Sequence, residues 1–493
     1  MNTTSLARYR AEWFGSAGDA RRDILAGMVG TFALIPEVIA FSFVAGIDPE
    51  VGLFASFVIG IVIAVAGGRP AMISGAAGSV ALVAAALMHA HGLRYLLAAT
   101  LLAGVFQILF GLAKLDVLLR FVSRSVRTGF VNALAILIFS AQLPQMIGVS
   151  WHSYAMIAGG LAIIYLLPRL TTAIPSPLIC ILVLTAINVA FPMPIRTVAD
   201  LGRLPASLPS FQLPNLPLDW ATLRIVLPFA FAMAAVGLLE SMMTASVVDE
   251  LTETRSSKAR ECTGLGLANV AAGLFGGIAG CGMIGQTVGN VRYGGRGRLS
   301  TLVAGVFLLV VMVPLRAWVA QVPVAALVAI MIMVSISTFS WGSIRDLAKH
   351  PKVSGVVMLA TVGVTVATHD LSAGVAVGVL LSGVFFAFKV ARLMDVRIDH
   401  DPLTDTRSYT VKGQILFASA DMFADRFDLR DTVRHVRIDL TAARLWDITA
   451  VGALEDVVTK MRRHGSIVEL IGLDQASAVL LDRHAPLVRE ATA

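Results

Sequence analysis

Long apolar runs alternate with short polar connections over most of the chain. The runs that are long enough, or nearly long enough, to cross a bilayer lie at residues 24–44, 50–67, 74–90, 93–113, 127–147, 153–168, 173–191, 222–247, 261–280, 284–292, 299–319, 323–341, 354–369 and 372–391. A membrane-spanning helix needs about 20 residues, so the third and tenth runs are short. The pattern predicts a polytopic α-helical membrane protein of about 14 spans.

A Pro-rich connection divides these runs into two groups of seven, which we interpret as inverted repeats at about 23–191 and 222–392. The short run is third in each group, and small residues surround both: GGRPAMISGAAG at 67–78 and GGIAGCGMIGQTVG at 276–289. Interrupted helices at matched positions of inverted repeats are the best sequence indication of a transport site. The alternative is a loop followed by a close helix contact through small residues.

Half-helices that begin in these two segments would point their unpaired N–H groups at one anion near the middle of the membrane. The residues expected to present these donors are Ala76, Ala77, Gly78, Met283, Ile284 and Gly285. Gln286 and Thr287 open the second half-helix, and we expect them to contact the substrate or an ion. Phe41, one turn beyond Glu37, would form a wall of the same pocket.

Two acidic residues lie inside apolar runs, where ionisable side chains are costly and are functional candidates. Glu37 is in the first span after Pro36, and Glu240 is in the eighth, so they occupy equivalent segments of the two repeats. Glu240 and Thr244 share a helix face. Their oxygens, together with a carbonyl at Gly285, would suit a hard cation such as Na⁺. A carboxyl group that exchanges a proton would couple transport to H⁺ instead, and a structural acid satisfied by a neighbouring helix is the third interpretation.

Composition agrees with this class of protein. Of 493 residues, 57% are hydrophobic and 14% charged, and the mean hydropathy is +0.80, far outside soluble composition. The net charge of +7 fits basic loops on one side of the membrane better than nucleic-acid binding. We therefore expect a multi-pass protein of the inner or plasma membrane with both termini cytoplasmic, after a short polar N-terminal segment (1–22) without the features of a signal peptide.

No motif indicates an enzyme or a bound cofactor. The three cysteines lie far apart without metal-ligand spacing, and the sequence offers no convincing nucleophile with a base. The transport domain is expected to cover 23–395. A soluble α/β domain is expected at 405–493, where the pattern predicts strands at 408–416, 434–440 and 466–473 and helices at 421–427, 448–464 and 474–482.

Three stretches carry a family resemblance: IPEVIAFSFVAGIDPEVGLFASF at 35–57, ESMMTASVVDELTETRSSKARECTGLGLANVAAGLFGG at 240–277 and GQTVGNVRYGGRGRLS at 285–300. The chain resembles the SulP anion transporters, whose members carry a C-terminal STAS domain. The resemblance implies core and gate domains, a homodimer and elevator-like transport, with the anion between the third and tenth half-helices. In LWDITAVGAL at 445–454, Thr449 matches a position that is phosphorylated in some soluble STAS relatives; a helix cap without regulation is the alternative.

Two positions depart from the common family pattern. Glu37 stands where many members have Gln, and Gln286 stands where many have a basic residue. This pattern is similar to the sodium-dependent bicarbonate transporters of the family, in which an eighth-span acid and a Thr hold Na⁺; here these would be Glu240 and Thr244. We therefore expect Na⁺-coupled bicarbonate uptake. The alternatives are a sulfate permease coupled to H⁺ or working by exchange, a dicarboxylate or other organic-anion carrier, and a membrane sensor without transport.

Overall fold

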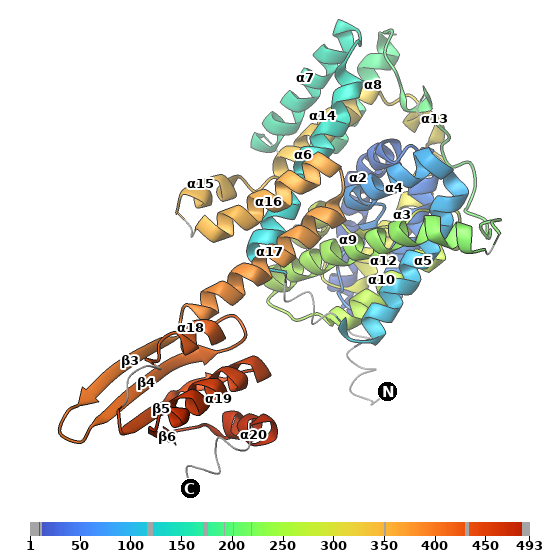
Figure 1. Ribbon diagram of the computed structural model, residues 1–493. Coiled ribbons are helices and arrows are strands. Elements are labelled where there is room, and N and C mark those ends of the chain that lie inside the picture. Colours follow the sequence, from blue (N-terminus) through green and yellow to red (C-terminus); the bar gives the residue numbers. More distant parts are fainter. Residues whose placement is uncertain are drawn as a thin grey trace. The chain divides into compact units, whose positions relative to one another are not determined.

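The computed structural model describes residue 9 and residues 12–115, 122–170, 176–191, 193–200, 202–217, 219–349, 352–428 and 433–485. The chain forms two compact units that divide between Val379 and Leu380, within helix α17. The first unit is helical and the second contains the main β-sheet (Figure 1). Each unit is described by itself.

Each of the fourteen predicted apolar runs corresponds to a helix. The helices are α2 (Ala17–Val44), α3 (Pro49–Ala66), α4 (Gly78–His91), α5 (Leu93–Leu112), α6 (Arg124–Met146), α7 (Trp151–Leu166), α8 (Ser176–Ala190), α9 (Trp220–Thr252), α10 (Lys258–Leu274), α11 (Ile284–Arg292), α12 (Arg298–Met312), α14 (Val324–Thr338), α16 (Lys352–Thr368) and α17 (Leu371–Ala391). Within the described residues, eight helical segments are long and apolar enough to cross a membrane, and four apolar helices are shorter.

The helix contacts repeat between the two halves of the first unit. Helix α12 packs against α2 and α3, and α5 packs in the same way against α9 and α10. Helix α4 contacts α9, and α11 contacts α2. Helices of each repeat therefore pack against helices of the other repeat, as expected for an inverted repeat. Helices α6, α7, α14 and α16 form a second group with contacts among themselves.

Glycine pairs allow the closest of these helix contacts. A side chain at Gly60 on α3 would strike the Cα atom of Gly305 on α12, 2.8 Å away. At the equivalent contact, a side chain at Gly104 on α5 would meet the carbonyl oxygen of Gly266 on α10 at 2.7 Å. Small residues let the backbones of helices approach closely in membranes, where association depends on van der Waals packing.

Two short strands join the interrupted segments. Strand β1 (Ser74–Gly75) precedes α4, β2 (Cys281–Gly282) precedes α11, and the two strands pair in antiparallel orientation. The sequence pattern predicts the interruption but not this pairing, because two residues of small side chain carry no strand periodicity. The third predicted run, 74–90, therefore becomes helical only at Gly78, and the ninth, 261–280, leaves the helix after Leu274.

Buried charged side chains hold the connections next to the interrupted segments. The guanidinium of Arg298 is buried and donates hydrogen bonds to the carbonyl oxygens of Ala64 (2.9 Å) and Gly67 (2.8 Å) at the end of α3. The carboxylate of Glu261 accepts from the N–H groups of Gly68 (2.7 Å) and Arg69 (2.9 Å). Both anchoring side chains belong to the second repeat, so they fix the chain that enters β1 in the first repeat.

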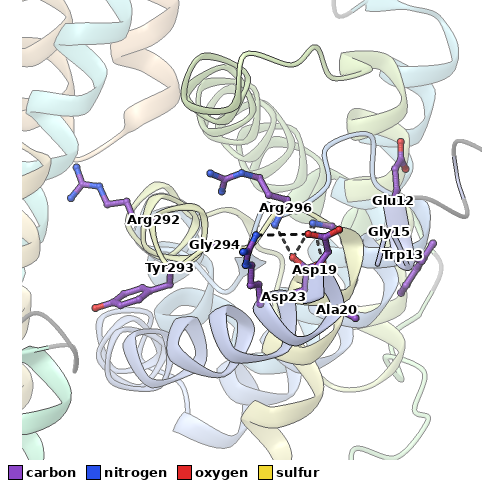
Figure 2. A pocket seen from close by; sticks show the side chains of 12 residues that line it. Glu12, Trp13, Gly15, Asp19, Ala20, Asp23, Arg292, Tyr293, Gly294 and Arg296 are labelled. Carbon is purple, nitrogen blue, oxygen red and sulfur yellow. Dashed lines mark hydrogen bonds and ion pairs between the residues drawn. The ribbon is translucent and has the colours of Figure 1, made fainter. Parts of the chain in front are cut away.

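A third anchor acts on the connection after α11. Asp23 of α2 points toward this connection (Figure 2). Its carboxylate accepts hydrogen bonds from the backbone N–H groups of Arg296 (2.8 Å) and Gly297 (3.0 Å). Gly297 is the N-terminal cap of α12, so Asp23 satisfies donors that a helix start leaves unpaired.

The second unit contains a four-stranded sheet in the order β3-β4-β5-β6. Its elements are β3 (Asp395–Asp401), β4 (Thr406–Ile415), α18 (Ala420–Ala424), β5 (His435–Leu445), α19 (Ile448–Arg463), β6 (Ile467–Ile471) and α20 (Gln475–His484). Strands β3 and β4 are antiparallel, and the remaining neighbours are parallel. Helices α19 and α20 contact each other and the sheet (Figure 1).

Besides β1 and β2, the strand β3 and two short α-helices are absent from the sequence expectations. Strand β3 is an edge strand in which only Val396 is buried, so its sequence has no alternation to detect. The short helices α13 (Arg316–Val319) and α15 (Trp341–Lys349) also escape the pattern, since neither is long enough to form an apolar run of its own. The three strands and three helices expected in the C-terminal domain are all present.

Candidate functional site

The N-terminal ends of α4 and α11 lie next to each other because β1 and β2 pair directly before them. The first intrahelical hydrogen bonds run from Ala81 N to the carbonyl of Ala77 and from Thr287 N to that of Met283. The N–H groups of residues 78–80 and 284–286 therefore have no partner within their helices. Two helix N-termini, each with a positive dipole end, converge on one place in the first unit.

A cavity of about 250 Å³ lies at this place. Its walls are formed by Glu37, Phe41, Ala77, Gly78, Phe130, Val131, Leu134, Ile138, Pro177, Glu240, Met243, Met283, Ile284, Gly285, Gln286, Met333, Val334, Ser337 and Thr338. They come from both interrupted segments, from α2 and α9, from α6 and α14 of the second helix group, and from α8. Two of these lining residues are acidic and none is basic.

Glu240 is held by the first turn of α4 and by β2. Its carboxylate accepts a hydrogen bond from the Ser79 hydroxyl and one from the Cys281 thiol, with 3.1 Å between the Cys281 sulfur and the carboxylate oxygen. Thr244, one turn further along α9, is fully buried and places its hydroxyl 2.8 Å from the Gly282 carbonyl oxygen. A carboxylate, a hydroxyl and a backbone carbonyl are thereby assembled from α9 and β2, which is the oxygen chemistry that hard cations prefer.

Glu37 and Gln286 meet on another side of the cavity. The side-chain amide of Gln286 lies against the Glu37 carboxyl group, which is also within electrostatic range of Glu240. Gln286 is 3% exposed, and its Nε2 atom has no partner in hydrogen-bonding geometry. The amide of Gln286 is therefore placed to interact with the Glu37 carboxyl group at the cavity wall.

The two glycines at the half-helix starts have different surroundings. A side chain at Gly78 would strike the ring of Phe41 at 2.7 Å, so Phe41 covers this helix start. A side chain at Gly285 would meet nothing within 4 Å. The backbone of α11 is therefore the more open of the two N-termini, and Phe41 forms a wall of the cavity as the sequence predicts.

Three predicted contacts need correction. Ala76 does not line the cavity, because its N–H donates to the Ser56 hydroxyl at 3.0 Å. Thr287 is fully buried and bonds to both backbone groups of Ile73, so it joins α11 to the segment before β1. The carbonyl beside Thr244 belongs to Gly282 and not to Gly285, since a carbonyl in the first turn of a helix points along the helix axis, away from its N-terminus.

Ser79, Cys281 and Ser241 contribute to the arrangement but were not predicted. The first two donate to Glu240, and the hydroxyl of Ser241 accepts from the Gly282 N–H at 2.8 Å. Ser79 directly follows the predicted donors Ala77 and Gly78, so its position was a usable signal. Cys281 gave no such signal, because a single cysteine in a Gly-rich stretch cannot be distinguished from a small residue that serves packing.

A second cavity, of about 460 Å³, lies at the opposite end of α11. Acidic and basic side chains line it in equal number: Glu12, Asp19, Asp23, Arg22, Arg292 and Arg296. Figure 2 shows Asp19 and Asp23 beside the connection between α11 and α12. Several of these charges are already used in backbone contacts or ion pairs, so this cavity has no net charge to select a ligand.

Thr449 lies in the first turn of α19 in the second unit and is exposed. The N-terminal cap of this helix is Asp447, whose carboxylate accepts from the N–H groups of Ala450 (2.9 Å) and Phe417 (2.7 Å). Thr449 is therefore not the cap, and its hydroxyl is accessible. Its phosphorylation stays a prediction.

Different protein families match the helical unit and the unit with the main β-sheet. The chain matches the Sulfate permease family at residues 21–161 and 150–361, and the STAS domain at 397–485. It is 51% identical over 476 residues to "Putative sulfate transporter YbaR" of Bacillus subtilis (strain 168), covering 97% of this chain and 98% of that protein. It is 26% identical over 504 residues to "Bicarbonate transporter BicA" of Picosynechococcus sp. (strain ATCC 27264 / PCC 7002 / PR-6), covering 92% and 88%.

Solved structures give the same fold. The transmembrane domain of a cyanobacterial bicarbonate transporter, BicA, superposes with a TM-score of 0.66 and 26% identity, covering 72% of this chain and 97% of that one. The murine anion transporter Slc26a9 (Solute Carrier 26 family member A9), in its inward-facing state, superposes with a TM-score of 0.80 at 17% identity, covering 94% of this chain and 87% of that one, which establishes likeness of fold. The chain belongs to the sulfate permease family of anion transporters, with a C-terminal STAS domain.

Proposed function

We propose that this protein imports a small inorganic oxyanion together with a cation, and that the pair is bicarbonate and Na⁺. The observation that carries the proposal is the cavity between the two half-helices, whose described lining residues include Glu37 and Glu240 and no basic residue. The unpaired N–H groups of α4 and α11 would bind the anion. Glu240, Thr244 and the Gly282 carbonyl would bind Na⁺.

Charge balance supports coupling to a cation. Each helix N-terminus contributes about half a positive charge, so the two ends together offset roughly one negative charge. Two carboxylates and an anion would leave a large uncompensated charge in a medium of low dielectric constant, where such charge is costly. A cation that enters with the anion removes part of this charge. It also explains how the site binds an anion without an arginine or a lysine.

The same argument favours bicarbonate over sulfate. Sulfate carries two negative charges and would need one more cation than bicarbonate in the same cavity. Similarity to the BicA proteins, which are named bicarbonate transporters, also supports bicarbonate. The second candidate is sulfate, which is favoured by the name of the relative with 51% identity. The apolar walls formed by Phe41, Phe130 and Met333 would admit an organic carboxylate as a third, weaker candidate.

In the proposed transport cycle, the half-helices α4 and α11 move together with α2 and α9 past the other helices that line the cavity. The cavity is shared between the interrupted segments with α2 and α9 on one side and α6, α8 and α14 on the other. A displacement of the first set against the second would carry anion and cation across the membrane, an elevator-type cycle. We further propose a homodimer in the inner or plasma membrane with cytoplasmic termini, in which the STAS unit regulates or supports the transport unit.

Uptake into proteoliposomes tests the proposal. The full-length protein is reconstituted, and uptake of labelled bicarbonate and of labelled sulfate is measured with and without an inward Na⁺ gradient. Bicarbonate uptake that requires Na⁺ is the expected result. Sulfate uptake without a Na⁺ requirement would replace it with the sulfate alternative. If purified protein binds either anion but moves neither, a sensor role without transport becomes the better account.

A further inference from the structure

Two large aromatic side chains are exposed at one end of the β-sheet in the second unit. Phe417 is 64% exposed and Trp446 is 60% exposed, and Ile448 beside them is 62% exposed. The three lie together because the backbone N–H of Phe417 donates to the carboxylate of Asp447, at 2.7 Å, between Trp446 and Ile448. Contiguous exposed apolar residues mark interaction sites, whereas single ones do not. We call Phe417, Trp446 and Ile448 the apolar edge.

The strand directions place the apolar edge at the end of the sheet where the chain enters from α17. The first residue of β3, Asp395, pairs with Lys412 of β4. Strands β4 and β5 run opposite to β3 and end at Ile415 and Leu445, three residues beyond the level of Lys412. At about 3.3 Å per residue, they extend about 10 Å past the start of β3. The apolar edge follows directly after these two strand ends.

The connection between α17 and β3 is short and held in place. It consists of Arg392, Leu393 and Met394, whose N–H groups bond to carbonyl groups of the last turn of α17. The side chain of Met394 is buried in the core of the second unit. A side chain at Gly413 of β4 would strike the carbonyl oxygen of Leu393 at 2.5 Å, so the connection packs closely against the sheet. The sheet therefore follows the end of α17 without a flexible linker.

Helix α17 has the length and composition of a membrane span. Its 21 residues have a mean hydropathy of 2.2, and at 1.5 Å per residue they extend about 31 Å, close to the thickness of the hydrocarbon core. Lys389 and Arg392 mark its end, where long basic side chains reach the headgroups. Asp395 is at most about 14 Å from Ala391. Strands that reach back about 10 Å bring the apolar edge to the headgroup level.

We propose that the apolar edge inserts into the headgroup region of the bilayer and fixes the STAS unit against the membrane. The bilayer is the occupant that the structure favours, because α17 holds it within reach of this edge. Trp446 has the features of an interfacial residue: its ring N–H donates to the side-chain oxygen of Gln414, and the guanidinium of Arg444 lies 5.5 Å from the ring centroid. Tryptophan and basic side chains with long apolar stems both favour this environment.

The consequence is a second attachment of the STAS unit to the membrane, beside the covalent one through α17. Amphipathic surfaces at a bilayer enter it by about 5–10 Å, a depth that exposed side chains of a sheet end can reach. With two attachments the sheet keeps one orientation relative to the bilayer. This inference does not depend on which anion or coupling ion the protein transports.

A fluorescent probe at the apolar edge tests the proposal in the full-length protein. Phe417→Cys is labelled with an environment-sensitive thiol dye and placed in lipid nanodiscs. Leu403→Cys is the control, because Leu403 is 95% exposed and lies between β3 and β4 at the opposite end of the sheet. The native cysteines are buried, so unsubstituted protein measures background labelling. We expect the dye at position 417, and not the dye at 403, to emit at shorter wavelength and to be quenched by lipids brominated near the headgroups.

A second variant separates lipid contact from folding. Ile448 is the first residue of α19, after the Asp447 cap, where an acidic side chain is favourable to the helix. Ile448→Asp should therefore fold normally, but its charge opposes burial in lipid. It should shift the emission of the dye at 417 to longer wavelength and reduce quenching by brominated lipid, whereas Leu403→Asp should change neither.

Two outcomes would overturn the proposal. If aqueous iodide quenches the dyes at 417 and 403 equally, and brominated lipid quenches neither, the apolar edge is free in solution. If the dye at 417 is protected from both iodide and brominated lipid, protein covers the edge instead of the bilayer. Failure of the proposed function is a separate result, because it appears as absent Na⁺-dependent anion uptake and leaves the fluorescence unchanged.

Discussion

The hydroxyl oxygen of Thr244 lies 2.8 Å from the carbonyl oxygen of Gly282, so a side chain of the long helix α9 meets the backbone of the strand that precedes α11. The same hydroxyl lies 2.9 Å from the carbonyl oxygen of Glu240 one turn earlier. Its single proton can serve only one of these acceptors. A cation at this point would relieve the crowding of oxygen atoms and would tie α9 to the strand that precedes α11.

Thr244→Val should weaken Na⁺ coupling. Valine has the shape of threonine but lacks the hydroxyl oxygen, so a cation would lose one ligand. We expect the half-saturating Na⁺ concentration for uptake to rise by about tenfold, which corresponds to about 1.4 kcal/mol. Thr244→Ser keeps the oxygen and should stay close to the wild type. An unchanged Na⁺ requirement in the valine variant would remove Thr244 from the cation site.

Glu240→Gln should abolish Na⁺-dependent uptake. The amide keeps the size of the side chain and can still accept a hydrogen bond from Ser79, but it has no charge to attract a cation. Loss of coupling should therefore occur in protein that elutes as a folded species and melts near the wild-type temperature. If Na⁺ still accelerates anion uptake in this variant, the coupling ion binds elsewhere.

The helical framework of this protein is predictable from its sequence, and so is the meeting of the two half-helices. The helix α11 occupies the residues expected for the tenth apolar run, 284–292, because glycine and polar residues on both sides end the apolar pattern clearly. The meeting of the segment at 76–78 with the segment at 283–285 was inferred by comparing the two repeats. Both inferences use local composition and symmetry, which a sequence displays directly.

The hydrogen-bond partners were not predictable, because they depend on how distant segments align. Ala76 and Ala77 have the same local pattern, yet only Ala76 gives its N–H to a side chain, Ser56 of α3. Thr287 has the same position in the sequence as a ligand at a helix start, but it turns toward Ile73. Membership in a half-helix is encoded locally, whereas the direction of each donor is decided by tertiary packing.

Glu261→Ala should reduce stability strongly although Glu261 lies outside the cavity. Its carboxylate accepts the N–H groups of Gly68 and Arg69, and these buried donors would be left without partners. Each unsatisfied buried group costs about 1–3 kcal/mol, so we expect a loss of about 3 kcal/mol and a clearly lower melting temperature in detergent. Glu250→Ala, an exposed acid near the end of α9, should change stability by less than about 0.5 kcal/mol. Equal melting of the two variants would contradict the anchoring role.

A pair of glycine substitutions separates anion binding from helix stability. A side chain at Gly285 or at Gly289 of α11 would meet nothing within 4 Å, so alanine fits at both positions. Alanine also stabilises a helix relative to glycine by up to about 1 kcal/mol. Of these two glycines, only Gly285 lines the cavity, where a methyl group would occupy space beside the free N–H groups of the first turn.

Gly285→Ala should therefore raise the KM for the anion several-fold without lowering the melting temperature, whereas Gly289→Ala should leave uptake unchanged. Equal KM values for the two variants would show that the anion does not bind at the start of α11.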